Sequence, residues 1–429
     1  MVKKPPDKET KSLFWFPSLL ASSNNIESHS WFDIKEIPNQ NITNPTLLDT
    51  NYKVNYLKTV KLPIYPNLKQ QEIIKKWYQD ITDTYNLANN YIKNNFKTDK
   101  TIINFIKLRK ILNSQLQIIS ARNKLNKHTV DYAVKHCIEM YKSCITRFSK
   151  TKKDFEIKDL TMDRNRYNMV IEPNAFSTKI NGFFVSVLGY MQTEKSISNK
   201  FTKNCILQYQ KNNNSYYILA PIDTMHFIND KRYNKCGIDL GVRTFGTLYS
   251  HEKVLEIGSN MKPVLHTYYK KIDSINSSHN KKIVKDKLYK KLVEKNGNKI
   301  RNKIEDLHKK LSVFLVRNYN EIIIGKMSTK SMVSNEKSNI REITKRMLMT
   351  LQFYKFNETL KNMADKYKSK VVFINEYKTS MTCHNCKNEK KDLKGNHEYE
   401  CNKCHIKLGR DINASINIYN MGFLGLQNP

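Results

Sequence analysis

The sequence predicts a multidomain α+β protein, in which a helical region and a small all-β domain precede a ribonuclease H-like domain interrupted by a zinc ribbon. Three observations carry this prediction. Apolar residues recur at helical spacing up to about residue 150 and then follow strand patterns to about residue 230. The rest of the chain has three strands followed by helix, strand, helix, strand and helix, the element order of the ribonuclease H-like fold. Two Cys-x2-Cys pairs lie between the last strand and the last helix.

The first region expected to be regular spans residues 59–152. Residues 1–58 are polar and rich in Asn and Ser, so we expect a partly ordered lead-in. A short extended segment covers Val60–Tyr65, and a helix begins near Asn67. Apolar residues at intervals of three and four continue to about Lys150, which predicts a basic helical bundle.

The pattern changes to strands over residues 153–230. Phe183–Leu188 is expected to be a strand, as are Cys205–Tyr209 and Tyr216–Leu219. The polar turn at Asn212–Asn214 joins the last two, which predicts a hairpin. We therefore expect a small all-β domain here.

The ribonuclease H-like part is expected over residues 231–378. Cys236–Gly241 is a strand that ends in a turn, and two further segments continue it as an antiparallel meander. Residues 261–310 are helical and basic, with 15 Lys or Arg against 5 Asp or Glu. The remaining expected segments are the strands Thr244–Ser250, Val254–Ile257, Glu321–Met327 and Val371–Glu376, the helix Ile343–Tyr367, and a last helix that begins near Asp411.

The charge of the chain points to a polyanionic partner. Its 429 residues include 74 Lys and Arg against 39 Asp and Glu, a formal net charge of +35. A compact state with that charge repels itself unless a polyanion screens it, so nucleic acid is the leading partner. We expect no membrane span, because no stretch of 18 apolar residues occurs. The apolar run Leu13–Leu20 is interrupted by Pro17 and lacks a good cleavage site, so we expect an intracellular protein.

The strongest motif is a pair of cysteine pairs. A spacer of 14 residues separates them, which suits a zinc ribbon that holds one Zn²⁺ tetrahedrally. All four positions are filled by protein ligands, so the role of the metal is expected to be structural. The expected ligands are Cys383, Cys386, Cys401 and Cys404; we expect the nearby His384, His397 and His405 to lie on the surface.

Two carboxylates stand out in the surrounding domain. Asp239 lies within a strand in Gly-Ile-Asp-Leu-Gly, where an acidic group is costly unless it binds a metal or is paired. A residue at a strand end or turn is the alternative for Asp239. Asp411 opens the last helix, where Asp is also favoured as an N-cap. On its own, Asp411 therefore leaves both interpretations open.

Three C-terminal motifs resemble the RuvC-type nucleases of the TnpB family. They are the segment around Asp239, Thr379-Ser380-x-x-Cys383-x2-Cys386, and Arg410-Asp411-x-Asn413-Ala414-x-x-Asn417-Ile418. TnpB proteins are encoded by insertion sequences and are similar to compact type V CRISPR effectors. Leu62-Pro63-x-x-Pro66 through Gln70, with Tyr85-Asn86-x-Ala88, is similar to the opening of the family. The resemblance therefore covers about residues 59–422.

The resemblance implies an RNA-guided DNA endonuclease. Its partners would be a guide RNA and target double-stranded DNA with a short flanking motif, with base reading delegated to guide pairing. We expect one protein chain in the RNA complex. The implied parts are a first wedge strand and helical recognition lobe (59–152), a β-barrel wedge domain (153–230), a RuvC nuclease domain (231–378), a zinc ribbon (379–408) and the last RuvC helix (409–429).

One position departs from the family pattern. The family ends its fourth nuclease strand with a catalytic Glu, and here that residue is Gly325. Glu376 is the best substitute, because it ends the next strand and adjacent strands lie about 4.8 Å apart. Glu321 points to the right face but lies about 13 Å back along the strand. Weaker candidates on the helical segment between the two strands are Glu342 and Glu358.

A Glu relocated after the fifth strand resembles the Fanzor proteins, the relatives of TnpB in eukaryotes and their viruses. For such a host we expect a nuclear location. Asp239, Glu376 and Asp411 would then hold two catalytic Mg²⁺ ions about 3.5–4 Å apart. Arg410 could neutralise the phosphate, or form a surface salt bridge. Gly325 motivates one alternative, a catalytically inactive RNA-guided DNA-binding protein; the shared fold motivates another, a DNA transposase.

Overall fold

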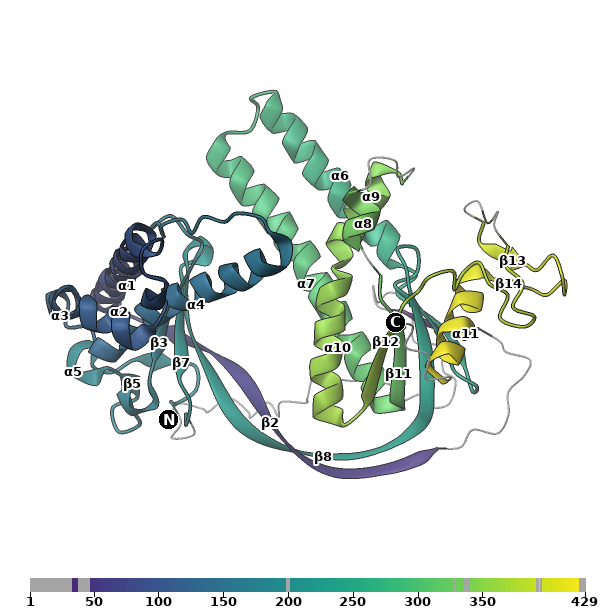
Figure 1. Ribbon diagram of the computed structural model, residues 1–429, viewed down its shortest axis with the longest axis horizontal. Helices are drawn as coiled ribbons and strands as arrows, with labels where there is room; N and C mark the ends of the chain where they lie inside the picture. The colour runs from purple at the N-terminus through teal and green to yellow at the C-terminus, as the bar shows by residue number, and fades with distance from the viewer. Residues whose placement is uncertain are drawn as a thin grey trace, which may run out of the picture. The chain divides into compact units, whose positions relative to one another are not determined.

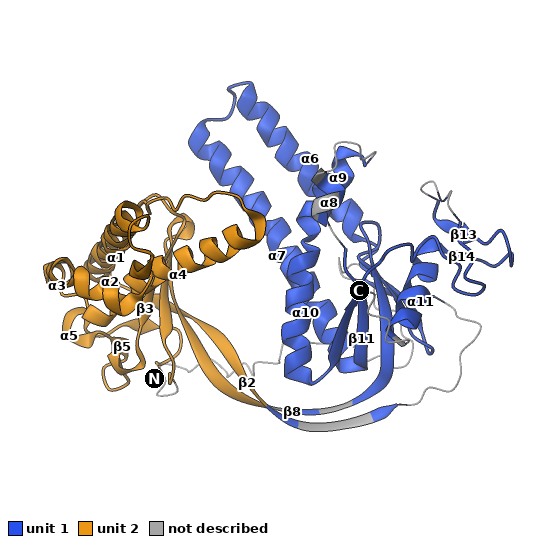
Figure 2. Ribbon diagram, viewed as in Figure 1, with its two compact units in different colours: residues 1–54, 226–429 blue, residues 55–225 orange. Residues whose placement is uncertain are grey.

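The chain forms two compact units. Unit 1 comprises residues 1–54 and 226–429, and unit 2 comprises residues 55–225 (Figure 2). Two long strands, β2 (Leu48–Tyr65) and β8 (Ser215–Leu240), have residues in both units. The apolar run at 13–20 and most of the lead-in lie outside the described residues. The computed structural model describes residues 33–37, 47–197, 201–327, 329–334, 340–390, 393 and 396–423.

The helices of unit 2 begin with α1 (Leu68–Asn95). The side chain of Asn67 accepts a hydrogen bond from the backbone N–H of Gln70, and the side chain of Gln70 accepts one from the backbone of Asn67. This reciprocal capping box satisfies two backbone donors that the first turn leaves free. The other helices are η1 (Lys100–Ile102), α2 (Phe105–Ile111), α3 (Asn113–Arg122) and α4 (Lys127–Thr151). Helices α1 to α4 extend from Leu68 to Thr151, which confirms the predicted helical pattern to about residue 150.

The strands of unit 2 include the predicted hairpin. β7 (Cys205–Gln210) pairs with the start of β8, and Gln210 pairs with Ser215. Asn214 in the turn has a φ of 48°, a left-handed conformation that Asn tolerates better than most residues. On its other edge β7 pairs antiparallel with β3 (Arg166–Ile171).

The strand predicted over residues 183–188 is wrong. Phe184 has a φ of 46°, and the chain then forms the helical turn α5 (Val185–Leu188). An apolar run alone does not reveal such a reversal, because short buried strands and short buried helical turns have similar composition. The remaining short elements of unit 2 are η2 (Pro173–Ala175), β4 (Phe176–Ser177), β5 (Gly182–Phe183), β6 (Gln192–Thr193) and η3 (Lys211–Asn213).

Unit 1 is built on a mixed sheet with the strand order β1-β10-β9-β8-β11-β12. The first four strands are antiparallel neighbours, and β11 runs parallel to both β8 and β12. Apart from β1, this is the predicted ribonuclease H-like arrangement; β1 is an added edge strand that the sequence did not indicate. The strands are β1 (Ile34–Ile37), β9 (Gly246–Tyr249), β10 (Val254–Ile257), β11 (Tyr319–Gly325) and β12 (Lys370–Ile374).

Helices cover both faces of this sheet (Figure 1). Ile322 and Ile324 belong to the larger core with α7 and α10. Ile323, which points the opposite way, packs with Ile418 of α11. Successive strand residues face opposite sides, so β11 is buried on both. The helices of unit 1 are α6 (Met261–Asn280), α7 (Asp286–Asn318), α8 (Thr329–Ser334), α9 (Glu342–Leu351), α10 (Phe353–Tyr367) and α11 (Arg410–Phe423).

Two long helical predictions are each divided by the structure. The basic stretch at 261–310 forms α6 and most of α7, which pack against each other as a hairpin (Figure 1). The helix predicted over 343–367 is broken at Gln352, whose φ of 49° is left-handed and ends α9. Across the described residues, no helix combines the length and apolar character needed to cross a membrane.

A buried histidine lies in the core between α7, α9 and α10. The ring centroid of His308 is 5.7 Å from that of Phe245 and 5.6 Å from that of Phe356. Its Nε2–H donates to the carbonyl of Leu351 at 2.9 Å, whereas Nδ1 is buried with no partner among the described residues. Burial lowers the pKa of His308 to about 4.

The stability of unit 1 is therefore expected to depend on pH through His308. Unfolded histidine titrates near pH 6.5, so between about pH 6.5 and 4 the unfolded chain binds the proton that the folded chain rejects. The free energy of unfolding should fall by about 3 kcal/mol as pH drops through this window. In His308→Gln, which cannot titrate, urea denaturation curves at pH 7 and pH 4.5 should lack this loss. The exposed control His266→Gln should behave as wild type; an unchanged pH slope in His308→Gln would contradict the assignment.

Candidate functional site

Asp239 lies near the end of the central strand and faces α11. An ideal Cβ built at Gly237 would lie 2.6 Å from the backbone N of Tyr419 and 2.7 Å from the carbonyl of Ser415. Glycine at that position therefore lets the helix approach the sheet closely. Side chains two residues apart in a strand share a face, so Asp239 also projects toward α11.

Asp411 is on the first turn of α11, one turn before Ser415. Burial raises the pKa of Asp239 well above its ordinary value, and the nearby carboxylates of Glu376 and Asp411 raise it further. The guanidinium of Arg410 acts in the opposite direction. The three carboxylates predicted from the sequence therefore lie close enough to interact electrostatically.

Glu376 occupies the space above Gly325. Gly325 is paired with Ile374, the last residue of β12, so Glu376 lies two residues beyond the strand that it was expected to end. An ideal Cβ built at Gly325 would lie 2.5 Å from the carboxyl carbon of Glu376 and closer still to its Oε1. A side chain at position 325 and the present position of Glu376 therefore exclude each other.

The environment of Glu376 suits a cation. Burial raises its pKa to about 7, and its Oε1 is buried with no hydrogen-bond partner among the described residues. A buried carboxylate without a partner is costly, and neutralisation or a bound cation removes that cost. Of the described residues, only the four cysteines form a group of possible metal ligands whose atoms all lie within 4.8 Å. The three carboxylates are thus less tightly gathered than the cysteines.

The alternative glutamates each have a lysine partner. Glu321 pairs with Lys370 at 2.7 Å, at the opposite end of β11 from Gly325. The two on the helical segment are paired likewise, Glu342 with Lys345 at 2.8 Å and Glu358 with Lys361 at 3.0 Å. None of these three carboxylates is among the groups that shift the pKa of Asp239.

The four cysteines gather as the spacing predicted. The Sγ atoms of Cys383 and Cys404 are 3.6 Å apart, and those of Cys386 and Cys401 are 3.5 Å apart. Ligands at about 2.3 Å from a tetrahedral Zn²⁺ would lie about 3.8 Å from each other, so the cluster fits zinc. Burial raises the pKa of Cys383 to about 11, whereas backbone N–H donors lower that of Cys401 to about 6.

A short hairpin completes the ribbon. Its strands β13 (Glu398–Glu400) and β14 (Lys407–Gly409) are antiparallel, and Tyr399 packs with the cysteines in a small separate core. His384 is not part of the cysteine group; it is partly buried and its Nδ1 lies 3.2 Å from Oδ1 of Asn413.

Sequence reasoning assigned no role to Asn413 and Asn417. Both are buried, and both donate to backbone carbonyls of the segment that enters the ribbon. Asparagine is a poor helix former, so two of them four residues apart on one helix face are a signal of side-chain bonding. The motif at 410–418 contains both asparagines, so their role in side-chain hydrogen bonding could have been inferred from it.

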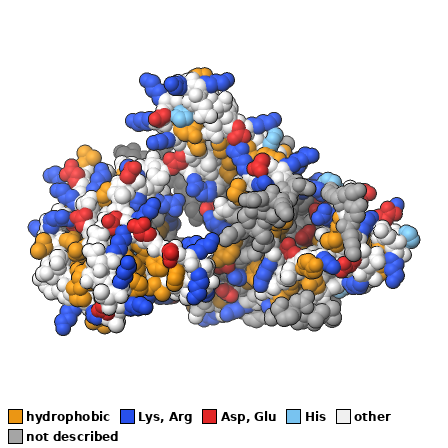
Figure 3. All heavy atoms as spheres, turned by 45° about the horizontal axis from the view of Figure 1, so that its top comes forward, with side chains coloured by type: hydrophobic (Ala, Val, Ile, Leu, Met, Phe, Trp, Pro, Cys, Tyr) orange, Lys and Arg blue, Asp and Glu red, His pale blue; other side chains and the backbone are white. Residues whose placement is uncertain are grey.

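Basic side chains are numerous on the surface. Lys and Arg side chains clearly outnumber acidic ones on the face drawn in Figure 3.

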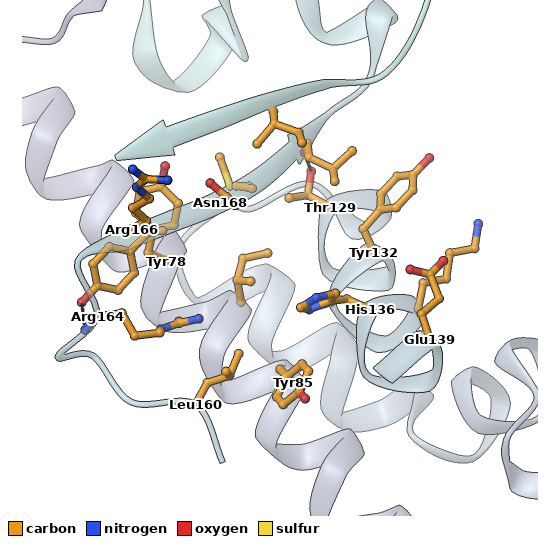
Figure 4. A pocket seen from close by; sticks show the side chains of 17 residues that line it. Tyr78, Tyr85, Thr129, Tyr132, His136, Glu139, Leu160, Arg164, Arg166 and Asn168 are labelled. Carbon is orange, nitrogen blue, oxygen red and sulfur yellow. Dashed lines mark hydrogen bonds between the residues drawn. The ribbon is translucent and has the colours of Figure 1, made fainter. Parts of the chain in front are cut away.

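Unit 2 has a cavity between α1, α4 and β3 (Figure 4). Its volume is about 470 Å³. Its lining combines aliphatic, aromatic and basic side chains, with Tyr85, Tyr132, His136, Arg164 and Arg166 among the residues that line it.

Comparisons with known sequences converge on one group. Residues 353–418 match the family model described as "Cas12f1-like, TNB domain". Two TnpB-like proteins of Acanthamoeba polyphaga mimivirus are each 31% identical to this chain over 97% of its length, covering 86% and 87% of those proteins. A putative transposase of the same virus is 28% identical over 95% of this chain and 90% of its own length.

Solved structures show a weaker likeness. A Cas12f1–sgRNA–target DNA complex has a TM-score of 0.34 and 16% identity, covering 85% of this chain and 99% of that chain. A CRISPR-Cas12f ternary complex has a TM-score of 0.32 and 14% identity, covering 82% of each.

A side chain at position 325 is expected to displace Glu376. Gly325→Ala should lower the free energy of unfolding by about 1–3 kcal/mol, the usual cost of overpacking a filled site. Gly297 in α7 is the matched control, because an added Cβ there meets nothing within 4 Å. Gly297→Ala should be stabilising by about 0.5–1 kcal/mol. Chemical denaturation measures both; equal or greater stability of Gly325→Ala would contradict the position of Glu376.

Removal of metal from the cysteine cluster should loosen the ribbon. Zinc ligation and folding are coupled, so chelation should accelerate amide hydrogen exchange across 379–408 and leave α1 unchanged. Cys404→Ser should reduce bound zinc from one ion per chain to nearly none, measured by atomic absorption. Cys144→Ser, a similarly half-buried thiol in α4, should keep one ion. Full zinc content in Cys404→Ser would show that the cluster is not the zinc site.

Proposed function

The chain belongs to the TnpB-like family of RuvC-type nucleases, and from that membership we propose that it is an RNA-guided DNA endonuclease. The target is cut by hydrolysis of phosphodiester bonds at the site formed around Asp239. Guide RNA supplies the sequence specificity, and the protein recognises a short motif that flanks the target. One protein chain acts in each RNA complex.

The observation that carries this proposal is the exchange between Gly325 and Glu376. The residue that the family pattern expects as Glu is a glycine, yet a glutamate carboxylate lies where its side chain would begin. That carboxylate also acts on the pKa of Asp239 together with Asp411. In this proposal the site keeps three acidic groups, although one of them comes from the segment after a different strand.

The donor set suits Mg²⁺, which prefers carboxylate oxygens. Asp239, Glu376 and Asp411 would hold it, and the partnerless Oε1 of Glu376 fits such a role. When bound, two such ions would activate water and stabilise the departing 3′ oxygen. Arg410, whose Nε is buried and has no described partner, is suited to bind the phosphate oxygen beside Asp411.

Nucleic acid is the partner that the charge supports. At +35 the chain offers many phosphate contacts, and the hairpin of α6 and α7 concentrates them. We propose that unit 2 provides the recognition lobe and the wedge barrel. Its cavity, lined in part by aromatic and basic side chains, has room for a nucleobase that stacks on tyrosine while arginine neutralises the phosphate.

Within the family, the relocated glutamate favours the Fanzor group. Proteins of that group are similar in having Gly or Cys at the earlier position and Glu after the next strand, as at Gly325 and Glu376 here. The alternative of a catalytically inactive RNA-guided binding protein is motivated by the same glycine, and the experiment below separates the two.

Substitution of Glu376 tests the proposal. In complex with its co-expressed RNA and Mg²⁺, the wild-type protein should cut matched duplex DNA. Glu376→Gln should slow cleavage by about 100-fold or more, a barrier change of about 2.7 kcal/mol, because a neutral amide binds Mg²⁺ weakly. Gel-shift affinity for the guide RNA should stay within about twofold of wild type.

Glu358→Gln is the control, because Glu358 forms an ion pair with Lys361 on α10. This variant should cleave normally. Normal cleavage by Glu376→Gln would contradict the relocated site. Guided binding by the wild type without cleavage of any flanking sequence would favour the inactive protein, and products joined to new DNA ends would favour a transposase.

A further inference from the structure

The two buried asparagines of α11 bind the backbone at the start of the zinc ribbon. Nδ2 of Asn417 donates to the carbonyl of Thr379 at 2.9 Å and to that of Thr382 at 2.7 Å. Nδ2 of Asn413 donates to the carbonyl of Thr382 at 2.8 Å, and its Oδ1 accepts from the backbone N–H of His384 at 2.9 Å. One helix face therefore satisfies the backbone of a segment that has no regular structure of its own.

Asn417 is connected to Glu376 through the hydrogen bonds of Thr379. The backbone N–H and Oγ1 of Thr379 donate to the carbonyl of Glu376 at 3.2 Å and 3.1 Å. The carbonyl of Thr379 is in turn held by Asn417. Thr379 is buried, so these bonds are shielded from competing water. The position of the Glu376 turn thus depends on a side chain of α11.

The same helix carries Asp411, two residues before Asn413. Asp411 therefore moves with the helix that holds the Glu376 turn. α11 also packs on the end of β12, because Ile418 and Ile374 share a small buried cluster, but Glu376 lies beyond Ile374, the last paired residue of that strand. Asn417 adds a hydrogen-bonded connection, through Thr379, between the helix that carries Asp411 and the backbone of Glu376.

We propose that Asn417 is a positioning residue that sets the distance of the Glu376 carboxylate from that of Asp411, with Asn413 extending the same connection to the first cysteine pair. This inference rests on the proposed function, because it assigns the two carboxylates to one metal-binding site. Partners that orient metal ligands typically contribute about 10- to 100-fold to metal affinity. A purely structural role for Asn417 would instead change stability and leave metal affinity unaltered.

The test measures binding of Mn²⁺, a paramagnetic substitute for Mg²⁺, to the intact zinc-loaded protein with its RNA. In Asn417→Asp, the shape is kept but the donor to the two carbonyls is lost. Electron paramagnetic resonance titration should give a Kd for Mn²⁺ about 10- to 100-fold weaker than in wild type. Bound zinc should remain at one ion per chain, and guide RNA affinity should be unchanged. Asn417→Ala should show the same loss.

The matched control is Asn420→Ala, on the same helix and partly exposed. It should bind Mn²⁺ as the wild type does. Two failures are distinguishable. If Asp239→Asn binds Mn²⁺ as the wild type does, or if the wild type binds none, the proposed nuclease site fails. If Asp239→Asn abolishes Mn²⁺ binding and both Asn417 variants bind it as well as the wild type does, the positioning role fails. Where a variant also loses stability, a normal Kd measured below its unfolding temperature overturns the inference.

Discussion

The space above Gly325 can hold only one side chain, and the candidate site depends on which chain segment fills it. Here it is filled from the neighbouring strand by Glu376, so the glycine is a requirement of the arrangement and not a loss. The carboxylate is then partly buried, and this burial raises its pKa to about 7. A site of this kind gains strong interactions with cations because it disfavours an uncompensated negative charge.

A second condition is the close approach of α11 to the sheet. Gly237 and Gly422 both lie where an added Cβ would meet the opposing element. Gly237 lets the helix carrying Asp411 approach β8, the strand carrying Asp239, and Gly422 lets the same helix approach Ile323 of β11. The buried asparagines then fix the entering segment of the ribbon on the same helix. These packing contacts and hydrogen bonds hold α11 against both the sheet and the start of the ribbon.

Much of the nuclease-like sheet was predictable, because its strands are short apolar runs at clear turns and their order is characteristic. The cysteine cluster was predictable because its ligands are close in sequence. Other features depended on tertiary context. The strand Ile34–Ile37 has no distinctive pattern and is recognised only by its pairing with β10. The reversal at Phe184 and the break at Gln352 require left-handed conformations, which neither Phe nor Gln favours, so the residue types do not predict them. The roles of Asn413 and Asn417 required knowing which carbonyls lie opposite the helix.

The division of the chain between its two units has a consequence for synthesis on the ribosome. Unit 2 is one continuous segment and can fold as soon as it has emerged, whereas the sheet of unit 1 takes strands from both sides of it. The edge strand β1 is made early and must wait for β10, and the helix with Asp411 comes after every strand of that sheet. A nascent chain would therefore acquire its basic helical unit, with the capacity to contact nucleic acid, well before it could assemble all three carboxylates. With the proposed function, each new molecule would gain the capacity to bind nucleic acid before the capacity to cut it.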